Sequence, residues 1–206
     1  MSGVELDNDG PASPFDRESQ KRQKRRAVIR AAGQAFRRHG YHNTGMVEIA
    51  QALGLTKAAL YYYVKNKEEI LYECHLMVYG AMDKIIDSHM TVDHANALER
   101  LSGLFHDFVT MLTSDGLSLL TDVNSLKGAW RTDILSRRAR IERQVTEIVK
   151  DGIEDGSIRS RDAHLSTFFF MGALNWLNAW YDNEGRVSGQ AVATHFTEQM
   201  REGLRG

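Results

Sequence analysis

Groups that donate hydrogen bonds to phosphate oxygens are concentrated in one short stretch of the chain, residues 44–67. Threonine and tyrosine hydroxyls and lysine ammonium groups are such donors, and a lysine can also reach the O6 and N7 edge of guanine. Helices that begin near Met46 and Lys57 would add backbone N–H groups, and small alanines would let the backbone approach a groove floor. The residues predicted to contact DNA are Thr44, Met46, Thr56, Lys57, Ala58, Ala59, Tyr61, Tyr62, Tyr63 and Lys67.

The charge distribution of the chain also indicates an anionic partner. The formal net charge is −1, but residues 17–67 hold twelve lysines and arginines against two acids. Residues 68–206 hold fourteen basic and twenty-one acidic side chains, and residues 1–16 hold four acids and no base. A basic segment on an otherwise acidic chain is typical of proteins that contact nucleic acid or an anionic membrane. A merely solvated helix face is the alternative.

Signatures of catalysis and of metal binding are missing from the sequence. It contains no P-loop, no G-x-G-x-x-G, no H-E-x-x-H and no G-x-S-x-G motif, so we do not predict an enzyme. His89, Asp93 and His94 are close in sequence, but their spacing fits no zinc signature. We therefore expect neither a metal nor a cofactor.

The cellular setting is predicted from three simple features. The single cysteine, Cys74, cannot form an internal disulfide and is interpreted as a packing residue. No apolar run reaches the roughly 20 residues that cross a bilayer. The acidic first residues do not resemble a signal peptide. We expect a cytoplasmic protein with no membrane partner.

The predicted fold class is all-α. The only prolines are Pro11 and Pro14, and the alternating Val, Ile and Thr runs typical of strands are absent. Apolar periodicity and end signals predict helices over residues 21–39, 46–53, 57–64, 67–89, 94–113, 116–127, 131–155, 162–182 and 188–204. The predicted N-caps are Thr44 or Gly45, Thr56, Asn66, Asp93, Asp162 and Ser188.

The predicted DNA contacts lie within a three-helix unit. Two short helices flank a tight turn at residues 52–55, and Ile49 and Leu60 contribute to a core too small to stand alone. The preceding helix must cover that core with Phe36, which gives a helix-turn-helix whose last helix projects outward. Three consecutive tyrosines cannot all face inward, and Tyr63 is predicted to be the partly buried one.

Three parts follow along the chain. Residues 1–17 are predicted to be a disordered tail, residues 18–66 a helix-turn-helix DNA-binding domain, and residues 67–206 a helical ligand-binding and dimerisation domain. No flexible linker precedes the helix that begins at Lys67. This helix should therefore join the two domains rigidly.

An ordered series of residues within 27–71 matches the pattern of a known family. The series is Phe36, Gly40, Thr44, Met46, Glu48-Ile49-Ala50, Gly54-Leu55, Ala58-Ala59-Leu60-Tyr61, Lys67-Glu68 and Ile70 or Leu71. It resembles the N-terminal domain of the TetR family of bacterial regulators. Two departures are the absence of a hydroxyl at Ala58-Ala59 and the presence of Val64 where the family usually has phenylalanine.

This resemblance implies a homodimer that binds a palindromic operator and represses until a ligand binds its C-terminal helices. It implies phosphate contacts from Thr44, Thr56, Tyr61, Tyr62 and Lys67. It implies base contacts from Lys57, Ala58, Ala59 and Tyr63.

One segment of the body, residues 168–181, is apolar nearly all round and should be covered on several sides. With the helix over residues 188–204, it could form a four-helix bundle with the same helices of a second copy. The residues predicted at this dimer interface are Phe168, Gly172, Ala179, Trp180, Val192, Phe196 and Met200.

Methionine and aromatic residues of the body suit an adaptable apolar pocket, although each is also an ordinary core residue. The predicted effector contacts are Phe105, Phe108, Met111, Leu112, Trp130, Phe169 and Trp176, with Leu119 and Leu120 as further candidates. The segment from Asn175-Trp176 to Trp180-Tyr181 resembles the acyl-CoA-responsive subgroup of the TetR family, with Ala179 in place of an arginine.

That resemblance implies an acyl-CoA thioester or an apolar carboxylic acid as effector. Five arginines could hold its phosphates, or could form a solvated helix face with i,i+4 ion pairs. They are Arg131, Arg137, Arg138, Arg140 and Arg143. A drug-responsive efflux repressor and a non-specific DNA-compaction protein are the alternatives to an acyl-CoA-responsive repressor.

Overall fold

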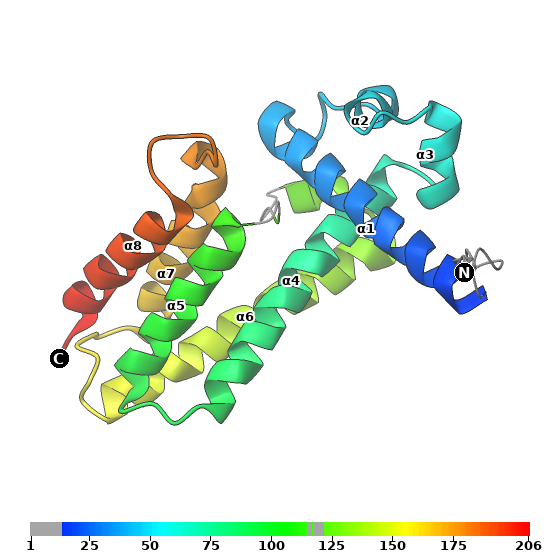
Figure 1. Ribbon diagram of the computed structural model, residues 1–206. Coiled ribbons are helices and arrows are strands. Elements are labelled where there is room, and N and C mark those ends of the chain that lie inside the picture. The colour runs from blue at the N-terminus through cyan, green and yellow to red at the C-terminus, as the bar shows by residue number, and fades with distance from the viewer. Residues whose placement is uncertain (1–13, 115–116, 118–121) are drawn as a thin grey trace, which may run out of the picture.

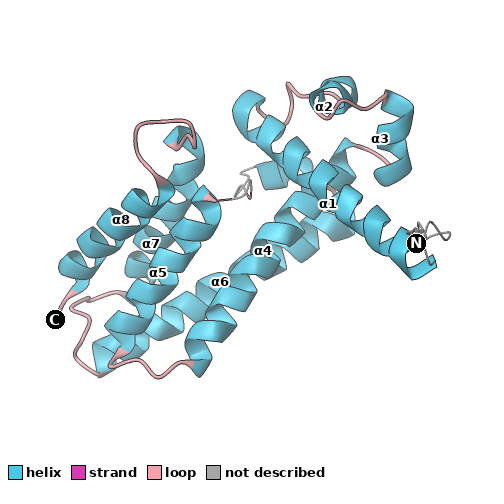
Figure 2. Cartoon of the chain, viewed as in Figure 1, coloured by secondary structure: helices cyan, strands magenta, loops and turns pink. Residues whose placement is uncertain are grey.

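The computed structural model describes residues 14–114, 117 and 122–206. Over these residues the chain forms helices and loops, with no strand beyond an isolated bridge between Ile158 and Arg205, so the all-α prediction is confirmed (Figure 2). The helices are α1 (Pro14–His39), α2 (Met46–Ala52), α3 (Lys57–Tyr63), α4 (Lys67–Thr91), α5 (Ala97–Thr113), the 3-10 helix η1 (Asp122–Ser125), α6 (Gly128–Glu154), α7 (Ala163–Trp180) and α8 (Gly189–Leu204). None of the helices in the described ranges is long and apolar enough to cross a membrane.

The helices form two groups that the long helix α4 connects. Figure 1 shows α1, α2 and α3 together at one end of the molecule, and α5, α7 and α8 side by side at the other. α6 packs along α4 and also against α5 and α7. The end of the molecule that holds α3 is therefore linked to the body by the continuous helix α4 rather than by a loose segment.

Side chains at the helix starts determine where most helices begin. As predicted, the N-caps of α3, α4, α7 and α8 are Thr56, Asn66, Asp162 and Ser188, each accepting a hydrogen bond from a backbone N–H of the first turn. For α5 the predicted cap was wrong. Asn96, not Asp93, accepts from the Glu99 N–H, so the connection after α4 is longer than predicted.

Two other predicted boundaries differ from the structure. α1 begins at Pro14, so residues 14–17 belong to a helix rather than to a tail. Proline is tolerated there because the N–H groups of the first turn have no partner within the helix. Residues 122–125 form a 3-10 turn, where a helix over residues 116–127 was predicted. The rest of the predicted tail, residues 1–13, lies outside the described residues.

The apolar core extends from the three-helix unit into the body. Phe36 and Leu60 are fully buried in that unit, as the sequence predicts. In the body, the ring of Phe170 on α7 meets Phe105 and Phe108 of α5 edge-on, at centroid distances of 5.0 and 6.1 Å. Such aromatic contacts, with the α5–α8 packing, make the body a tightly packed bundle.

Candidate DNA interface and effector body

The outer side of α3 presents polar groups to solvent. We call Lys57, Ala58, Tyr61 and Tyr62 the reading face, and all four residues are exposed. Tyr61 is 45% and Tyr62 64% exposed, large fractions for aromatic side chains, whereas Leu60 between them and the core is fully buried. The reading face therefore combines accessible hydroxyl and ammonium donors on one short helix, at the end of the molecule farthest from α7 and α8 (Figure 1).

A lysine from α1 extends the reading face. The Lys21 ammonium lies 4.4 Å from the centre of the Tyr62 ring, a cation–π contact. Lys21 was not among the predicted DNA contacts, because it is 41 residues away from Tyr62 and lies in a run of similar charges. Only the packing of α1 against α3 distinguishes it from its neighbours.

Lys67, the first residue of α4, contacts the turn after α1 instead of projecting freely. Its Nζ donates to the His42 carbonyl oxygen at 3.3 Å and lies 4.2 Å from the centre of the Tyr41 ring. Burial lowers the pKa of Lys67, against the attraction of Asp122 and Glu48. The predicted phosphate contact of Lys67 would thus come from an ammonium that already positions the turn after α1 against the start of α4.

Two predicted contacts lie in the interior of the three-helix unit. Thr44 is only 2% exposed, and its hydroxyl donates to the carbonyl oxygens of Gly40 at 2.9 Å and Ala35 at 3.4 Å. The side chain of Met46 is half-buried and packs against the core. The structure therefore contradicts a phosphate contact from the Thr44 hydroxyl, because that hydroxyl closes the turn between α1 and α2.

The remaining predicted contacts lie at the edges of the reading face. The exposed Thr56 hydroxyl oxygen accepts from the Ala59 N–H at 3.1 Å, which leaves its proton available to another acceptor. Ala59 is half-buried. Tyr63 is half-buried too, as predicted, and its ring meets that of Tyr62 at a centroid distance of 5.2 Å.

Arg25 ties α1 to both α3 and α4, and sequence reasoning did not single it out. Its Nε donates to the Tyr63 carbonyl oxygen at 3.1 Å. Its terminal nitrogen donates to Glu69 at 3.0 Å and to Glu73 at 2.7 Å. The hydrogen bond to Glu73 is the main cause of the raised pKa of Arg25. The end of α3 is thus coupled to the first turns of α4 through one guanidinium.

The predicted effector contacts do not gather in one place. Phe105, Phe108 and Leu112 are buried in the core of the body. Phe169 and Trp176, however, are 61% and 66% exposed. These two side chains do not line an interior pocket of the subunit in this structure, so the structure does not bring them together with the three buried residues. Leu119 and Leu120 lie outside the described residues.

Met111 and Trp130, the remaining predicted contacts, are both half-buried. Trp130 at the start of α6 stacks on Tyr72 of α4, with ring centroids 5.1 Å apart and 11° between the planes. The Tyr72 hydroxyl donates to Asp133 at 3.0 Å, and Asp133 also accepts from Arg137 at 3.0 Å. Arg137 is the main cause of the lowered pKa of Asp133. This network fastens α6 to α4.

Some of the α6 arginines are already paired. Arg137 bonds to Asp133, and Arg140 forms an ion pair with Asp83 of α4. Arg131 donates to the Asn124 side chain at 3.3 Å. A phosphate bound here would have to compete with these carboxylates.

One side of α7 is apolar and uncovered within the subunit. Its exposed residues recur at helical spacing, so they form a single stripe, which we call the α7 stripe. It consists of Leu165, Phe168, Phe169, Gly172, Trp176, Ala179 and Trp180. Phe196 of α8 is half-buried, and its ring centroid lies 5.8 Å from that of Trp180. Val192 and Met200, predicted at a dimer interface, are instead buried inside the subunit, 3% and 2% exposed.

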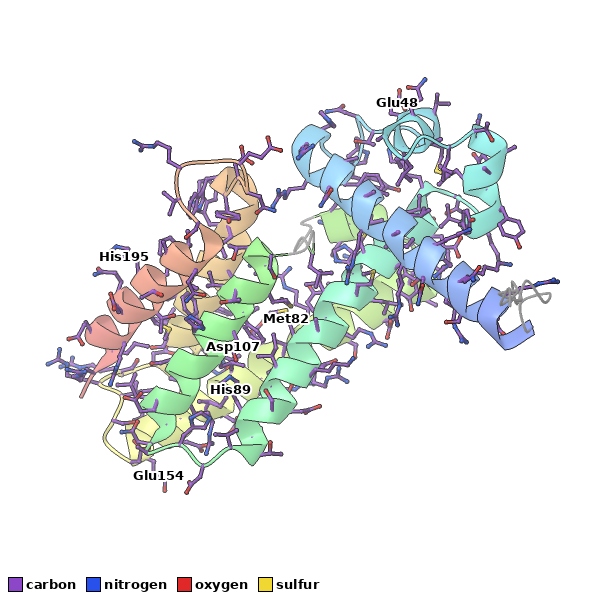
Figure 3. The ribbon with its side chains drawn as sticks, in the orientation of Figure 1. Glu48, Met82, His89, Asp107, Glu154 and His195 are labelled. Atoms are coloured by element: carbon purple, nitrogen blue, oxygen red, sulfur yellow. The ribbon has the colours of Figure 1, made fainter. Side chains whose placement is uncertain are left out.

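The histidines near the end of α4 form a hydrogen-bonded bridge. His89 Nε2 lies 2.9 Å from an Asp107 carboxylate oxygen of α5, and its Nδ1 lies 3.2 Å from His94 Nε2 (Figure 3). Asp93 is exposed and makes no part of this bridge. Within the described part of the chain, no group of three or more candidate ligands gathers around a point that could hold a metal ion.

Comparison with known proteins agrees with this architecture. Residues 28–74 match the family model described as bacterial regulatory proteins, tetR family. Residues 94–204 match the model described as tetracyclin repressor-like, C-terminal domain.

Individual relatives cover nearly the whole chain. The fatty acid metabolism regulator protein of Bacillus subtilis (strain 168) is 23% identical over 198 residues, which cover 90% of this chain and 97% of that protein. The HTH-type transcriptional repressor KstR2 of Rhodococcus jostii (strain RHA1) is 25% identical over 199 residues, covering 93% and 96%. AibR, solved in complex with isovaleryl coenzyme A and operator DNA, has a TM-score of 0.72 and 26% identity, over 85% of this chain and 96% of AibR. From its fold, its exposed reading face and these matches, the chain belongs to the TetR family of bacterial regulatory proteins.

Proposed function

We propose that this TetR-family chain is a transcriptional repressor that binds a palindromic operator as a homodimer and is released by an acyl-CoA thioester. The observation that carries the proposal is the exposed reading face on α3, which belongs to a three-helix unit that the continuous helix α4 connects to a helical body. This is the arrangement that a regulator needs, because one part must contact DNA while the other responds to a signal.

At the operator, α3 lies in the major groove. Lys57 and Ala58 face base edges, while the hydroxyls of Tyr61 and Tyr62 donate to phosphates. Lys21 adds a phosphate contact beside Tyr62, supported by the 4.4 Å distance between its ammonium and that ring.

The homodimer forms through the α7 stripe. Exposed phenylalanines and tryptophans on one helix face make an unfavourable contact with water unless a partner covers them. Phe168, Phe169 and Trp176 would pack against the same stripe of a second copy around a two-fold axis. Two reading faces related by that axis would recognise a palindromic site.

The effector class rests on relatives. AibR was solved with isovaleryl coenzyme A and operator DNA together, and the Bacillus subtilis relative is a fatty acid metabolism regulator. Apolar carboxylic acids and aromatic or cationic drugs are the competing classes. A thermal-shift screen separates them, because a ligand that binds only the folded state raises Tm.

Operator binding is tested by fluorescence anisotropy with the promoter of the neighbouring operon. Binding should be nanomolar, should weaken with salt, and should be at least about a thousandfold tighter than binding to random DNA of the same length. Equal affinity for both DNAs would favour a compaction protein. Addition of isovaleryl-CoA should release the labelled operator.

The reading face is tested by removal of one hydroxyl. Tyr61→Phe should weaken operator binding about tenfold, because a hydrogen bond to a charged phosphate contributes about 1.5 kcal/mol or more. The matched control is Tyr181→Phe, which removes a hydroxyl from the body. If Tyr61→Phe and Tyr62→Phe both bind the operator as tightly as the wild type does, these hydroxyls do not contact DNA.

A further inference from the structure

A basic groove lies where α1 and α4 diverge. Figure 1 shows α1 crossing α4 and then separating from it toward the start of α1. The groove has a volume of about 530 Å³, within the range of small-molecule sites. Its walls come from both helices, so it adjoins the DNA-reading unit and the body together. We call it the α1–α4 groove.

The rim of the α1–α4 groove carries basic side chains, some of which have no acidic partner among the described residues. Arg26, Arg30 and Lys84 are exposed, and among the described residues none of the three forms an ion pair. Arg22 reaches only the exposed Glu18, at 3.6 Å. Arg25 also lines the groove, paired with Glu73. The groove thus offers a cluster of guanidinium groups to an anion, the group that binds phosphate bidentately.

The floor of the groove is apolar and open. Leu76 and Met77 of α4 are half-buried there, and Gly80 and Ala81 follow them one turn later. A Cβ added at Gly80 would have no atom within 4 Å. A glycine inside a long helix costs about 1 kcal/mol relative to alanine, so its presence here needs a local reason. Keeping the groove floor clear supplies that reason.

We propose that the α1–α4 groove binds the phosphate-bearing end of the acyl-CoA effector, an inference that rests on the proposed function. The phosphates of coenzyme A would lie among Arg22, Arg26 and Arg30, and its pantetheine arm along the floor beside Gly80. The groove has the chemistry for this ligand: two guanidinium groups at the rim, Arg26 and Arg30, that form no ion pair among the described residues, and an apolar strip along α4.

This location explains how the effector would act on DNA binding. The Arg25–Glu73 ion pair spans the groove and Arg25 also holds the end of α3 through the Tyr63 carbonyl. A phosphate among the arginines competes with Glu73 for Arg25 and separates α1 from α4. The effector then binds more tightly to a conformation in which α3 is oriented differently from its orientation on DNA. Release of the operator requires this difference in affinity between the two conformations.

The rim is tested by titration calorimetry of the full-length protein with isovaleryl-CoA. The double variant Arg26→Gln/Arg30→Gln should bind isovaleryl-CoA at least tenfold more weakly than the wild type. The matched control, Arg159→Gln/Arg161→Gln, removes two exposed arginines outside the groove and should bind as the wild type does. Coenzyme A without an acyl group should compete with isovaleryl-CoA, and isovaleric acid should not.

The floor is tested by filling it. Gly80→Leu should weaken isovaleryl-CoA binding at least tenfold while Tm stays level or rises, because leucine favours helix and meets no clash at its Cβ. Gly80→Ala, a smaller addition at the same site, should raise Tm and keep most of the affinity.

The possible results distinguish a wrong groove assignment from a wrong proposed function. If the wild type binds isovaleryl-CoA and leaves the operator, but the Arg26/Arg30 and Gly80→Leu variants respond as the wild type does, the groove assignment is wrong and the proposed function stands. If the wild type binds no acyl-CoA, the effector class itself fails, and the groove assignment with it. If, in the absence of any CoA, Arg26→Gln/Arg30→Gln loses as much operator affinity as Tyr61→Phe does, these arginines contact DNA and the groove proposal is overturned.

Discussion

Hydroxyl groups of the three-helix unit, α1 to α3, differ in their accessibility. The Thr44 hydroxyl is buried and donates to the Gly40 carbonyl oxygen, so it stabilises the turn between α1 and α2. The Tyr61 hydroxyl is on an exposed side chain and is available to a partner. Burial therefore explains a stabilising role for the Thr44 hydroxyl, and the exposure of Tyr61 supports the contact with DNA that we propose for it.

Thr44→Val should therefore lower the free energy of unfolding by about 1–2 kcal/mol, because it removes a buried hydrogen bond and leaves a carbonyl oxygen with one partner fewer. Urea denaturation measures this change. Tyr61→Phe, the control, should stay within about 0.5 kcal/mol of the wild type. A Thr44→Val protein as stable as the wild type but unable to hold operator DNA would return Thr44 to the interface.

His75 is the buried titratable group of α4. It is 1% exposed, neither ring nitrogen has a hydrogen-bond partner among the described residues, and its ring stacks on Tyr79 with centroids 6.0 Å apart. Burial, with a smaller contribution from the charge of Arg138, lowers the pKa of His75 from 6.5 to about 4. The folded protein therefore holds this imidazole neutral at neutral pH.

This lowered pKa predicts a loss of stability in acid. Above pH 6.5 His75 is neutral in both states, and as pH falls toward 4 only the unfolded chain takes up the proton. The loss attributable to His75 should approach about 3 kcal/mol at pH 4. His75→Leu should remove it, so the difference in unfolding free energy between the variant and the wild type should grow between pH 6.5 and pH 4. A constant difference across that window would contradict the assignment.

At the scale of elements, α7 has two apolar sides with different partners. Phe170 and Leu174 face the core and are fully buried, whereas Phe169 and Trp176 lie on the exposed α7 stripe. A helix that is apolar nearly all round must be covered nearly all round, and only part of that cover comes from its own subunit. The rest is the surface that we assign to the second copy.

Trp176→Glu should convert the dimer into a monomer, because it places an uncompensated charge at the centre of the apolar contact. Sedimentation velocity measures the change in mass. The control is Met90→Glu, which adds the same charge to another exposed apolar residue, on α4. If both variants stay dimeric at micromolar concentration, the α7 stripe is not the dimer interface.

At the scale of the whole molecule, charge is separated along its length. The basic residues of 17–67 lie at the end with the reading face, while the rest of the described chain is mainly acidic. The acidic body is repelled by DNA, so only one end of the protein binds it well. Operator affinity should consequently depend strongly on salt.

Lys21→Ala should reduce the slope of log K against log salt concentration by about one per subunit, since each lost phosphate contact removes about one. Anisotropy titrations between 50 and 200 mM salt, roughly the range over which such slopes are measured, provide the comparison. Lys150→Ala on α6 is the control, because Lys150 is exposed in the body and paired with Glu147. An unchanged slope in Lys21→Ala would contradict a phosphate contact from Lys21.

Much of the local structure was predictable because its causes lie three or four residues apart. Thr56, Asn66, Asp162 and Ser188 cap the helices that the periodicity predicts, and a cap needs only its own first turn. The helix boundaries that failed depend on longer connections. Asn96 replaced Asp93 as the cap of α5, because the chain after α4 must first turn back along it.

The fold class, the order of the helices and the position of the helix-turn-helix follow from the amino-acid sequence, since periodicity and capping are local properties. Which side chains remain available to a partner depends instead on packing between distant parts of the chain. The contacts of Arg25 with Glu73 and of Lys21 with Tyr62 join residues more than 40 positions apart. Phe169 and Trp176 show the same limit: hydrophobicity predicts that a residue will be covered, but not whether its own core or a second molecule covers it.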